Sequence, residues 1–158
     1  MVIDYPFDNY LNANKDHLPL ESKTDDDDVF QYLSLNYSFN HANMRYSPCN
    51  NTEEYFTNGI INGAQWYPTV GSMQDFNYWS YGCYEITPEI SCCKYPTESE
   101  LETNWLENRV PLVEYLKLAN SGIRGIISYL NGEPAKYLSV GIDNREPLFK
   151  TNENGEYY

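Results

Sequence analysis

The hydrophobic pattern of this chain changes period near Ser121, and that change most constrains the possible fold. Residues 97–119 carry a helical pattern that a capping box of Thr97 and Glu100 opens and that Asn-Ser-Gly closes, with a kink expected at Pro111. Beyond it, three short runs alternate as strands and are separated by Asn-Gly turns. The sequence therefore predicts a domain of α/β character over residues 1–121, followed by the start of an all-β unit over residues 122–158.

Shorter signals divide the first 121 residues further. In chain order they predict a buried strand at 1–6, a helix at 24–39, a loop at 42–63, a short helix ending near Gly82 and a strand at 83–91. Thr24 or Asp25 is expected to cap the first helix. The four aspartates at 25–28 suit the positive start of that helix, although the same run could bind a metal.

The net charge of −13 argues against nucleic acid or an anionic membrane surface as a partner and favours cationic ligands. No apolar run is long enough to span a membrane, and the N-terminus has no secretory signal pattern. Four cysteines and the sequons at Asn36 and Asn50 nevertheless favour export. We therefore expect an incomplete piece of an exported, glycosylated protein.

Glu89 is the acid whose sequence surroundings draw most attention. It lies in a strand-like run with apolar neighbours, where partial burial would raise its pKa and suit it to act as a general base. A structural ion pair is the alternative role. No set of three metal ligands is visible, because His17 and His41 begin no His-x-x-Glu pattern and Cys92 and Cys93 point to opposite faces of a strand.

The run NGAQWYPTVGSMQDFNYWSYGCYEITPEISCCKYP, residues 62–96, resembles the regulatory branch of the zinc metallocarboxypeptidases, which includes carboxypeptidases N, E, M and D. The motifs DYPFD, DDDVFQYLSLNYS and SGIRGIISYLNGEP extend the resemblance over nearly the whole chain. CCKYP and TNENGEYY look closest to members M and D. The resemblance implies the second half of a mixed-sheet catalytic domain, followed by the first strands of a transthyretin-like sandwich.

The resemblance also implies roles for individual residues. Glu89 matches the general base that activates a zinc-bound water, and Tyr67 matches the tyrosine that closes over the substrate. Asp8 and Gln74 match the groups that select a C-terminal Lys or Arg, and a carboxylate suits either cation. The resemblance pairs Cys49 with Cys92 in a disulfide and leaves a partner outside the chain for Cys83 or Cys93.

This chain departs from the family pattern at Pro88, where Leu is usual, and at Ser72, where a second Gly is usual. The family's zinc ligands and the residues that hold the substrate carboxylate precede the DYPFD motif, so they are expected upstream of Met1. We therefore expect a fragment of a zinc enzyme, secreted or anchored at the cell surface, that trims C-terminal Lys or Arg from peptides. The alternative is an inactive family member that serves as a binding module.

Overall fold

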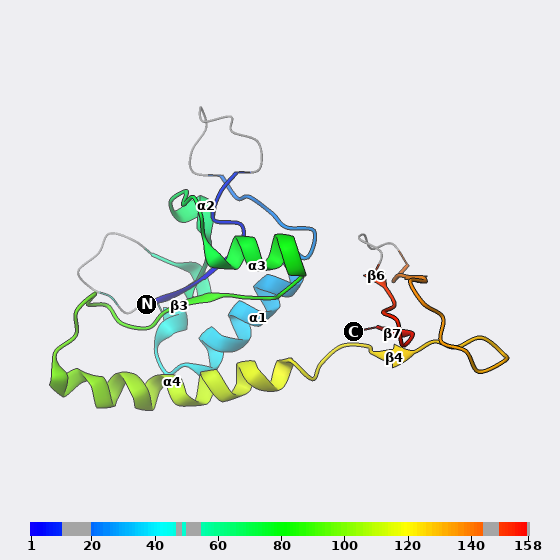
Figure 1. The fold of residues 1–158 in the computed structure, drawn as a ribbon. Helices are drawn as coiled ribbons and strands as arrows, with labels where there is room; N and C mark the ends of the chain where they lie inside the picture. Colours follow the sequence, from blue (N-terminus) through cyan, green and yellow to red (C-terminus); the bar gives the residue numbers. More distant parts are fainter. Residues whose placement is uncertain (11–19, 47–48, 50–54, 144–148, 158) are drawn as a thin grey trace. The chain divides into compact units, whose positions relative to one another are not determined.

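The structure, a computed structural model, describes residues 1–10, 20–46, 49, 55–143 and 149–157 (Figure 1). These residues form two compact units, Met1–Ala119 and Asn120–Tyr158, and each is described by itself. The first unit is mixed α/β with a mixed sheet, in agreement with the α/β class expected from the sequence. The assignment of residues 1–121 and 122–158 to particular domains stays a prediction.

A three-stranded sheet with the order β2-β1-β3 organises the first unit. The central strand β1 (Val2–Tyr5) pairs in parallel with β2 (Ile60–Asn62) and antiparallel with β3 (Thr87–Glu89). The predicted strands at both 1–6 and 83–91 are present, although β3 is shorter than expected. The prediction of loop throughout 42–63 is wrong at its end, because three residues are too few to show a strand period and β2 forms by pairing with the distant β1.

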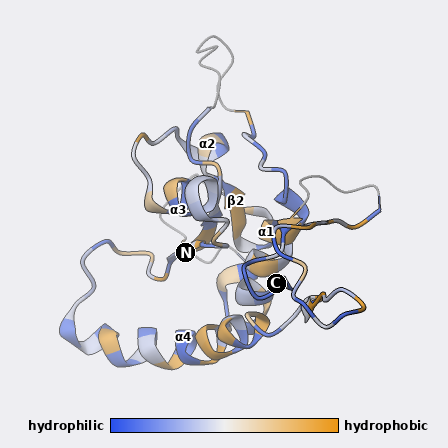
Figure 2. Ribbon diagram, turned by 45° about the vertical axis from the view of Figure 1, so that its right-hand side comes forward, coloured by the Kyte–Doolittle hydropathy of each residue, from blue (hydrophilic) through white to orange (hydrophobic). Residues whose placement is uncertain are grey.

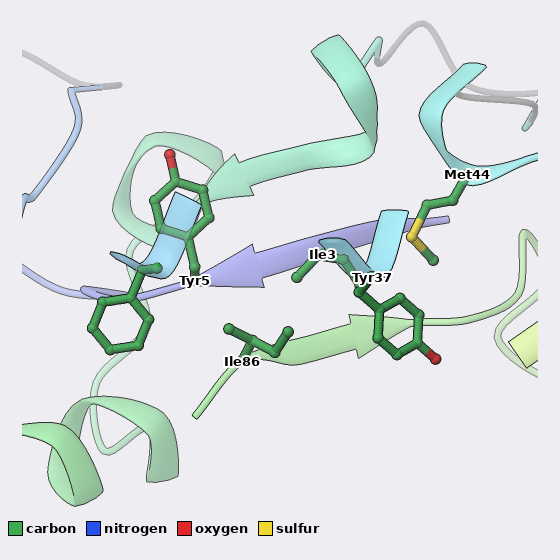
Figure 3. Close-up of a cluster of buried hydrophobic side chains, with 6 residues drawn as sticks. Ile3, Tyr5, Tyr37, Met44 and Ile86 are labelled. Carbon is green, nitrogen blue, oxygen red and sulfur yellow. The ribbon is translucent and has the colours of Figure 1, made fainter. Parts of the chain in front are cut away.

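The core lies between one face of this sheet and helix α1 (Asp27–Asn40). Ile3 and Tyr5 of β1 and Ile86, just before β3, pack against Phe30 and Tyr37 of α1, with Met44 completing the cluster (Figure 3). Phe30 and Tyr37 lie seven residues apart and therefore on the same face of the helix. This core fixes β1 and β3 side by side.

Helix α1 begins at Asp27, which is three residues after Thr24 and two residues after Asp25, the two residues predicted to cap it. Its N-cap is Asp26 and not Thr24 or Asp25, yet the Asp26 side chain makes no capping hydrogen bond. Its Oδ2 instead accepts hydrogen bonds from the hydroxyls of Tyr78 and Tyr84, both at 3.0 Å. The tertiary contact with these two tyrosines therefore takes the place of the local cap.

Three further helices belong to the first unit: α2 (Gly63–Trp66), α3 (Met73–Tyr81) and α4 (Glu98–Leu118). The predicted end of α3 at Gly82 is confirmed, with this glycine in the left-handed region at φ 65°. The capping box of Thr97 and Glu100 is also present. Helix α4 continues through Pro111 as one helix and packs against α1. Hydrophobic residues recur along its length (orange in Figure 2), and many of their side chains are exposed. Two 3₁₀ turns, η1 (Met44–Tyr46) and η2 (Thr57–Gly59), precede β2.

The second unit consists of two antiparallel strand pairs. β4 (Gly125–Ile126) pairs with β7 (Glu156–Tyr157), and β5 (Ser139–Val140) pairs with β6 (Phe149–Lys150). The buried Thr151, just after β6, holds the segment before β5, since its hydroxyl donates to the carbonyl of Ala135 and accepts the N–H of Leu138. Short strands are present as predicted, but a sandwich is not formed by the described residues.

Helices that could cross a membrane are not found among the described residues.

Candidate functional site

The side chains of the sheet alternate between an apolar face and a polar face. Ile3 points into the core, so its neighbour Asp4 points to the opposite face. In the antiparallel register, Asp4 lies opposite Thr87 and Val2 lies opposite Glu89. Residues paired in this way share a face of the sheet. Asp4, Thr87 and Glu89 are therefore carried together on the face of the sheet that is turned away from α1.

Glu89 is the last residue of β3, and the register runs unbroken through Pro88, which lies opposite Ile3. Since proline cannot donate to a ladder, its nitrogen must be directed away from β1, as is usual for a strand at the edge of a sheet. β3 is such an edge in the sheet of the described residues. Pro88 therefore leaves Glu89 in register. The partial burial expected for Glu89 is wrong, because its side chain at the end of an edge strand is exposed.

A cavity of about 470 Å³ lies beside Glu89, between the end of β3 and helix α4. Ile90, Trp105 and Leu112 give it largely apolar walls. Asp8, Gln74 and Tyr67 do not line it. Of the four residues predicted for the site, Glu89 is therefore the one that lines this cavity.

A line of hydrogen bonds joins β3 to the turn after β1. The Thr87 hydroxyl donates to Gln74 Oε1 at 2.8 Å, and Gln74 Nε2 donates to Asp8 Oδ1 at 2.6 Å. Gln74 is 1% exposed and Asp8 is 7% exposed. The structure thus brings together Asp8 and Gln74, two residues that the sequence predicted for one pocket, and links them to the strand that carries Glu89.

Two half-buried acids, Asp4 and Asp75, flank this line. Burial and, to a smaller extent, the negative charges of Asp8 and Asp75 together raise the pKa of Asp4 to about 8. Burial also raises the pKa of Asp75 to about 6, although the backbone N–H groups of Asp8 and Asn9 donate to its carboxylate and oppose the rise. Asp8 therefore has two further acids beside it, Asp4 and Asp75, whose pKa values are both raised.

Helices α2 and α3 position the remaining side chains. Ser72, the departure from the family's glycine, is the N-cap of α3 and accepts the N–H of Asp75 at 3.4 Å, so the serine helps to start the helix that carries Gln74. Gly63 starts α2 against Asp4 and Asp8, where a Cβ atom would collide with both carboxylates. The close approach requires glycine at this position.

Tyr67 follows α2 and is 56% exposed. Its ring contacts the ring of Trp66, with centroids 4.7 Å apart. The loop after it is anchored to the pocket, because the N–H of Thr69 donates to the carbonyl of Asp8 at 2.9 Å. Tyr67 therefore lies on a loop attached to the Asp8 turn.

The predicted disulfide between Cys49 and Cys92 is formed, with Cα atoms 5.3 Å apart. Cys83 and Cys93 are exposed thiols. Of the two predicted glycosylation sites, Asn50 lies outside the described residues. Asn36 lies within α1, and the hydroxyl-bearing residue of its sequon, Ser38, is 0% exposed.

The described residues of this chain do not fit a zinc ion, because they contain no group of three His, Cys, Asp or Glu side chains able to hold one. His41 is buried at the end of α1, where its Nδ1 accepts the N–H groups of Asn43 and Met44, and burial lowers its pKa. His17 lies outside the described residues. The aspartates at 27 and 28 occupy the first turn of α1, as the helix-start interpretation expected.

Sequence reasoning missed Asp4, Thr87 and Asp75, which the structure places around Asp8 and Gln74. A signal for two of them was available. Asp4 is the polar member of an otherwise apolar alternating strand, and Thr87 precedes Glu89 by two residues and so shares its face. The position of Asp75 depends on tertiary contacts with the Asp8 turn and has no such signal.

Comparison with known proteins identifies relatives of the whole chain. The zinc carboxypeptidase family model matches residues 1–110. Carboxypeptidase M of Mus musculus is 42% identical over 160 residues, and carboxypeptidase D of Drosophila melanogaster is 42% identical over 159. The carboxypeptidase N catalytic chain of Rattus norvegicus is 37% identical over 163.

Each of these alignments covers 100% of this chain but only 36%, 11% and 35% of the respective relative. The chain therefore spans about a third of the length of the M and N relatives and about a tenth of the D relative. The resemblance inferred from the sequence motifs is confirmed, and the chain belongs to the zinc carboxypeptidase family.

Proposed function

We propose that this chain is part of a metallocarboxypeptidase that removes C-terminal Lys or Arg from peptides and proteins. The observation that carries the proposal is the arrangement on the polar face of the sheet, where the Thr87-Gln74-Asp8 hydrogen bonds hold an acidic cluster next to the strand that presents Glu89. Family membership supplies the class of reaction.

Asp8 would receive the cationic end of the substrate's last side chain. Its carboxylate is buried and is held in place by Gln74, so an ammonium or guanidinium group entering the pocket would meet a fixed acceptor. None of the ion pairs of the described residues involves Asp8, Asp4 or Asp75. Asp8 therefore has no ion-pair partner among the described residues that a cationic ligand would have to displace.

Glu89 would act as the general base. An exposed carboxylate at the end of an edge strand can accept a proton from an attacking water and return it to the amine that leaves when the peptide bond breaks. Tyr67, exposed on its loop, would close over the bound residue and donate its hydroxyl to the peptide. Asp8 and Gln74 would hold the side chain so that the terminal peptide bond lies near Glu89.

Zinc, which the family implies, acts as a Lewis acid when bound. Because the described residues do not fit the ion, we propose that its ligands and the groups that hold the substrate carboxylate belong to a part of the protein upstream of this chain. The relatives are long enough to contain such a part, since this chain covers only 36% of carboxypeptidase M.

The same proposal assigns a domain to each of the two units and a location to the protein. Residues 1–121 would be the C-terminal part of the catalytic domain, and residues 122–158 would begin a transthyretin-like domain, which the two antiparallel strand pairs support. The disulfide between Cys49 and Cys92 supports an extracellular or secretory location. Anchoring of the protein to a membrane is compatible with this location.

The experiment uses a longer protein in which the upstream region precedes this chain. Peptides ending in Lys, Arg and Leu are offered to the unchanged protein and to the variant Glu89→Gln. We expect cleavage of Lys- and Arg-ended peptides only, with kcat lower by about 10²–10⁴-fold in the variant. Equal kcat in both proteins would reject Glu89 as the base, and equal cleavage of the Leu-ended peptide would reject the pocket.

A second candidate is an inactive family member that binds basic peptide ends without cleaving them. The absence of a metal-binding group among the described residues favours it. A longer protein that binds Lys- or Arg-ended peptides but leaves them intact after addition of zinc would establish this alternative.

A further inference from the structure

Asp4 is a half-buried acid for which the proposed reaction has no role. It lies on the central strand β1, opposite Thr87, on the same sheet face as Glu89. Its Oδ1 atom is buried and has no hydrogen-bond partner in the part of the chain that the structure describes. A buried acceptor without a partner destabilises the fold. Asp4 therefore calls for an explanation beyond packing.

Gly63 shows that Asp4 and Asp8 face the same small space. A Cβ atom on Gly63 would stand 2.7 Å from Oδ1 of Asp4 and would also collide with Oδ1 of Asp8. The two carboxyl groups are within hydrogen-bonding reach of each other. Two acids from a single strand and its turn thus converge on the start of α2.

The surroundings of Asp4 contain acids and no compensating cation. Asp8 and Asp75 are the charged groups that act on it, from the turn after β1 and from α3, while β3 contributes Thr87. The ion pairs found among the described residues lie at Lys23 and Lys117, away from this group. A cation brought by a ligand would complete the arrangement.

We propose that Asp4 is a second specificity-determining carboxylate of the Asp8 pocket, and that it releases a proton when the cationic end of a Lys or Arg side chain binds. This inference rests on the proposed function, because it deepens the selectivity of the same pocket. The neutral carboxyl of Asp4 loses its proton to solvent, and the resulting carboxylate pairs with the ammonium or guanidinium group together with Asp8.

The electrostatics of the empty pocket prepare this exchange. Burial and the negative charge of Asp8 keep the pKa of Asp4 at about 8, so the group is mostly neutral at pH 7. A cation within about 4–6 Å acts in the opposite direction and lowers the pKa of a carboxyl by roughly 1–3 units. The pocket therefore avoids two adjacent negative charges while empty and gains the second charge when a cation arrives.

The test is a pH titration of the Asp4 side-chain carboxyl carbon by NMR in this chain, without ligand, with L-arginine and with L-citrulline. Citrulline has nearly the shape of arginine but lacks its charge, and sodium chloride keeps the ionic strength equal. We expect arginine to lower the Asp4 titration midpoint by at least about one pH unit, and citrulline to leave it unchanged. A midpoint that arginine does not move would overturn the proposal.

Substitution provides a second, independent readout. Asp4→Asn should weaken arginine binding at pH 8.5 by roughly tenfold and abolish the release of a proton on binding. Asp25→Asn, at an exposed position before α1, is the matched control and should change neither quantity. Should Asp4→Asn fail to fold, the titration of the unsubstituted chain still decides the matter.

The result is separable from the proposed function. Two results together would reject this inference and leave the function intact. The first is that the longer protein cleaves Lys- and Arg-ended peptides equally well with and without Asp4→Asn. The second is that arginine does not move the titration midpoint of Asp4 in the unsubstituted chain. A longer protein that cleaves neither peptide rejects the function, while the arginine titration still reports on Asp4.

Discussion

The two faces of the sheet in the first unit are built from alternate residues of the same strands, yet they differ in almost every physical respect. On one face, Ile3 and Tyr5 are buried against α1 in the apolar core. On the other face lie Asp4, Thr87, whose hydroxyl donates to Gln74, and the exposed Glu89. Positions one residue apart in sequence thus belong to different environments.

Because of this difference, the apolar face contributes to the stability of the fold and the polar face contributes to the proposed chemistry. The apolar face stabilises the fold through burial, and it fixes the register of β1 against β3. The polar face costs stability, because acids are placed close together out of water. Substitutions on the first face should therefore change unfolding, while those on the second should change pH dependence and ligand binding.

The largest effect is expected on the apolar face. Phe30→Ala should lower the free energy of unfolding by about 3–5 kcal/mol, because the ring is 0% exposed and contacts Tyr78 at a centroid distance of 5.0 Å. Urea denaturation followed by tryptophan fluorescence measures the change. Tyr32→Ala, at an exposed position of the same helix, is the control and should cost far less. Similar losses in the two variants would contradict the placement of the core.

A smaller loss is expected where the polar face meets α2. Gly63→Ala should lower the free energy of unfolding by about 2–3 kcal/mol, because the added methyl would collide with the carboxylates of Asp4 and Asp8. Gln65→Ala, at a half-buried position in the same helix, is the comparison variant. Thermal unfolding of both would show the difference, and an undisturbed Gly63→Ala protein would mean that the two acids are not confined.

The polar face should also differ in how it makes the free energy of unfolding depend on pH. The pKa of Asp4 is raised from 3.8 to about 8, so the folded state keeps a proton that the unfolded state has lost between these values. The free energy of unfolding should therefore fall as the pH rises from about 4 to about 8. Asp4→Asn should remove this slope and stabilise the chain by about 1–2 kcal/mol at pH 8. Parallel curves for both proteins from pH 4 to 8.5 would refute the assignment.

The smallest effect on stability is expected at Tyr67. Tyr67→Phe should change the free energy of unfolding by less than about 0.5 kcal/mol, because the side chain is 56% exposed. In the longer protein, the same substitution should lower kcat/KM for Arg-ended peptides by about tenfold, since it removes a hydroxyl that the proposal places on the substrate. A variant with full kcat/KM would remove Tyr67 from the site.

Local signals in the sequence were sufficient for some elements. The end of α3 at Gly82 and the capping box of Thr97 and Glu100 depend on neighbours within one helical turn, and both predictions are confirmed. β2 was missed because its three residues become a strand only by pairing with β1, more than fifty residues away. The cap of α1 was misplaced because Asp26 is engaged by two tyrosines from a distant segment.

The residues of the candidate site also divide into those that sequence motifs predicted and those that depend on tertiary contacts. Motifs led to Asp8 and Gln74, which the structure places in hydrogen-bonding contact. The acids Asp4 and Asp75 escaped attention because their importance arises from where the turn after β1 meets α3. The roles of Glu89 and Tyr67 stay predictions, since they depend on a substrate and on a metal.

The disulfide between Cys49 and Cys92 has a topological consequence for this site. It closes a covalent ring between cysteines 43 positions apart in sequence, and the ring contains Gly63, Tyr67, Gln74, Thr87 and Glu89. By loop-closure entropy, such a ring restricts the unfolded chain by about 4 kcal/mol. Loss of the disulfide in a reducing compartment would therefore lower the stability of the first unit as a whole, including β1, which pairs with two strands inside the ring.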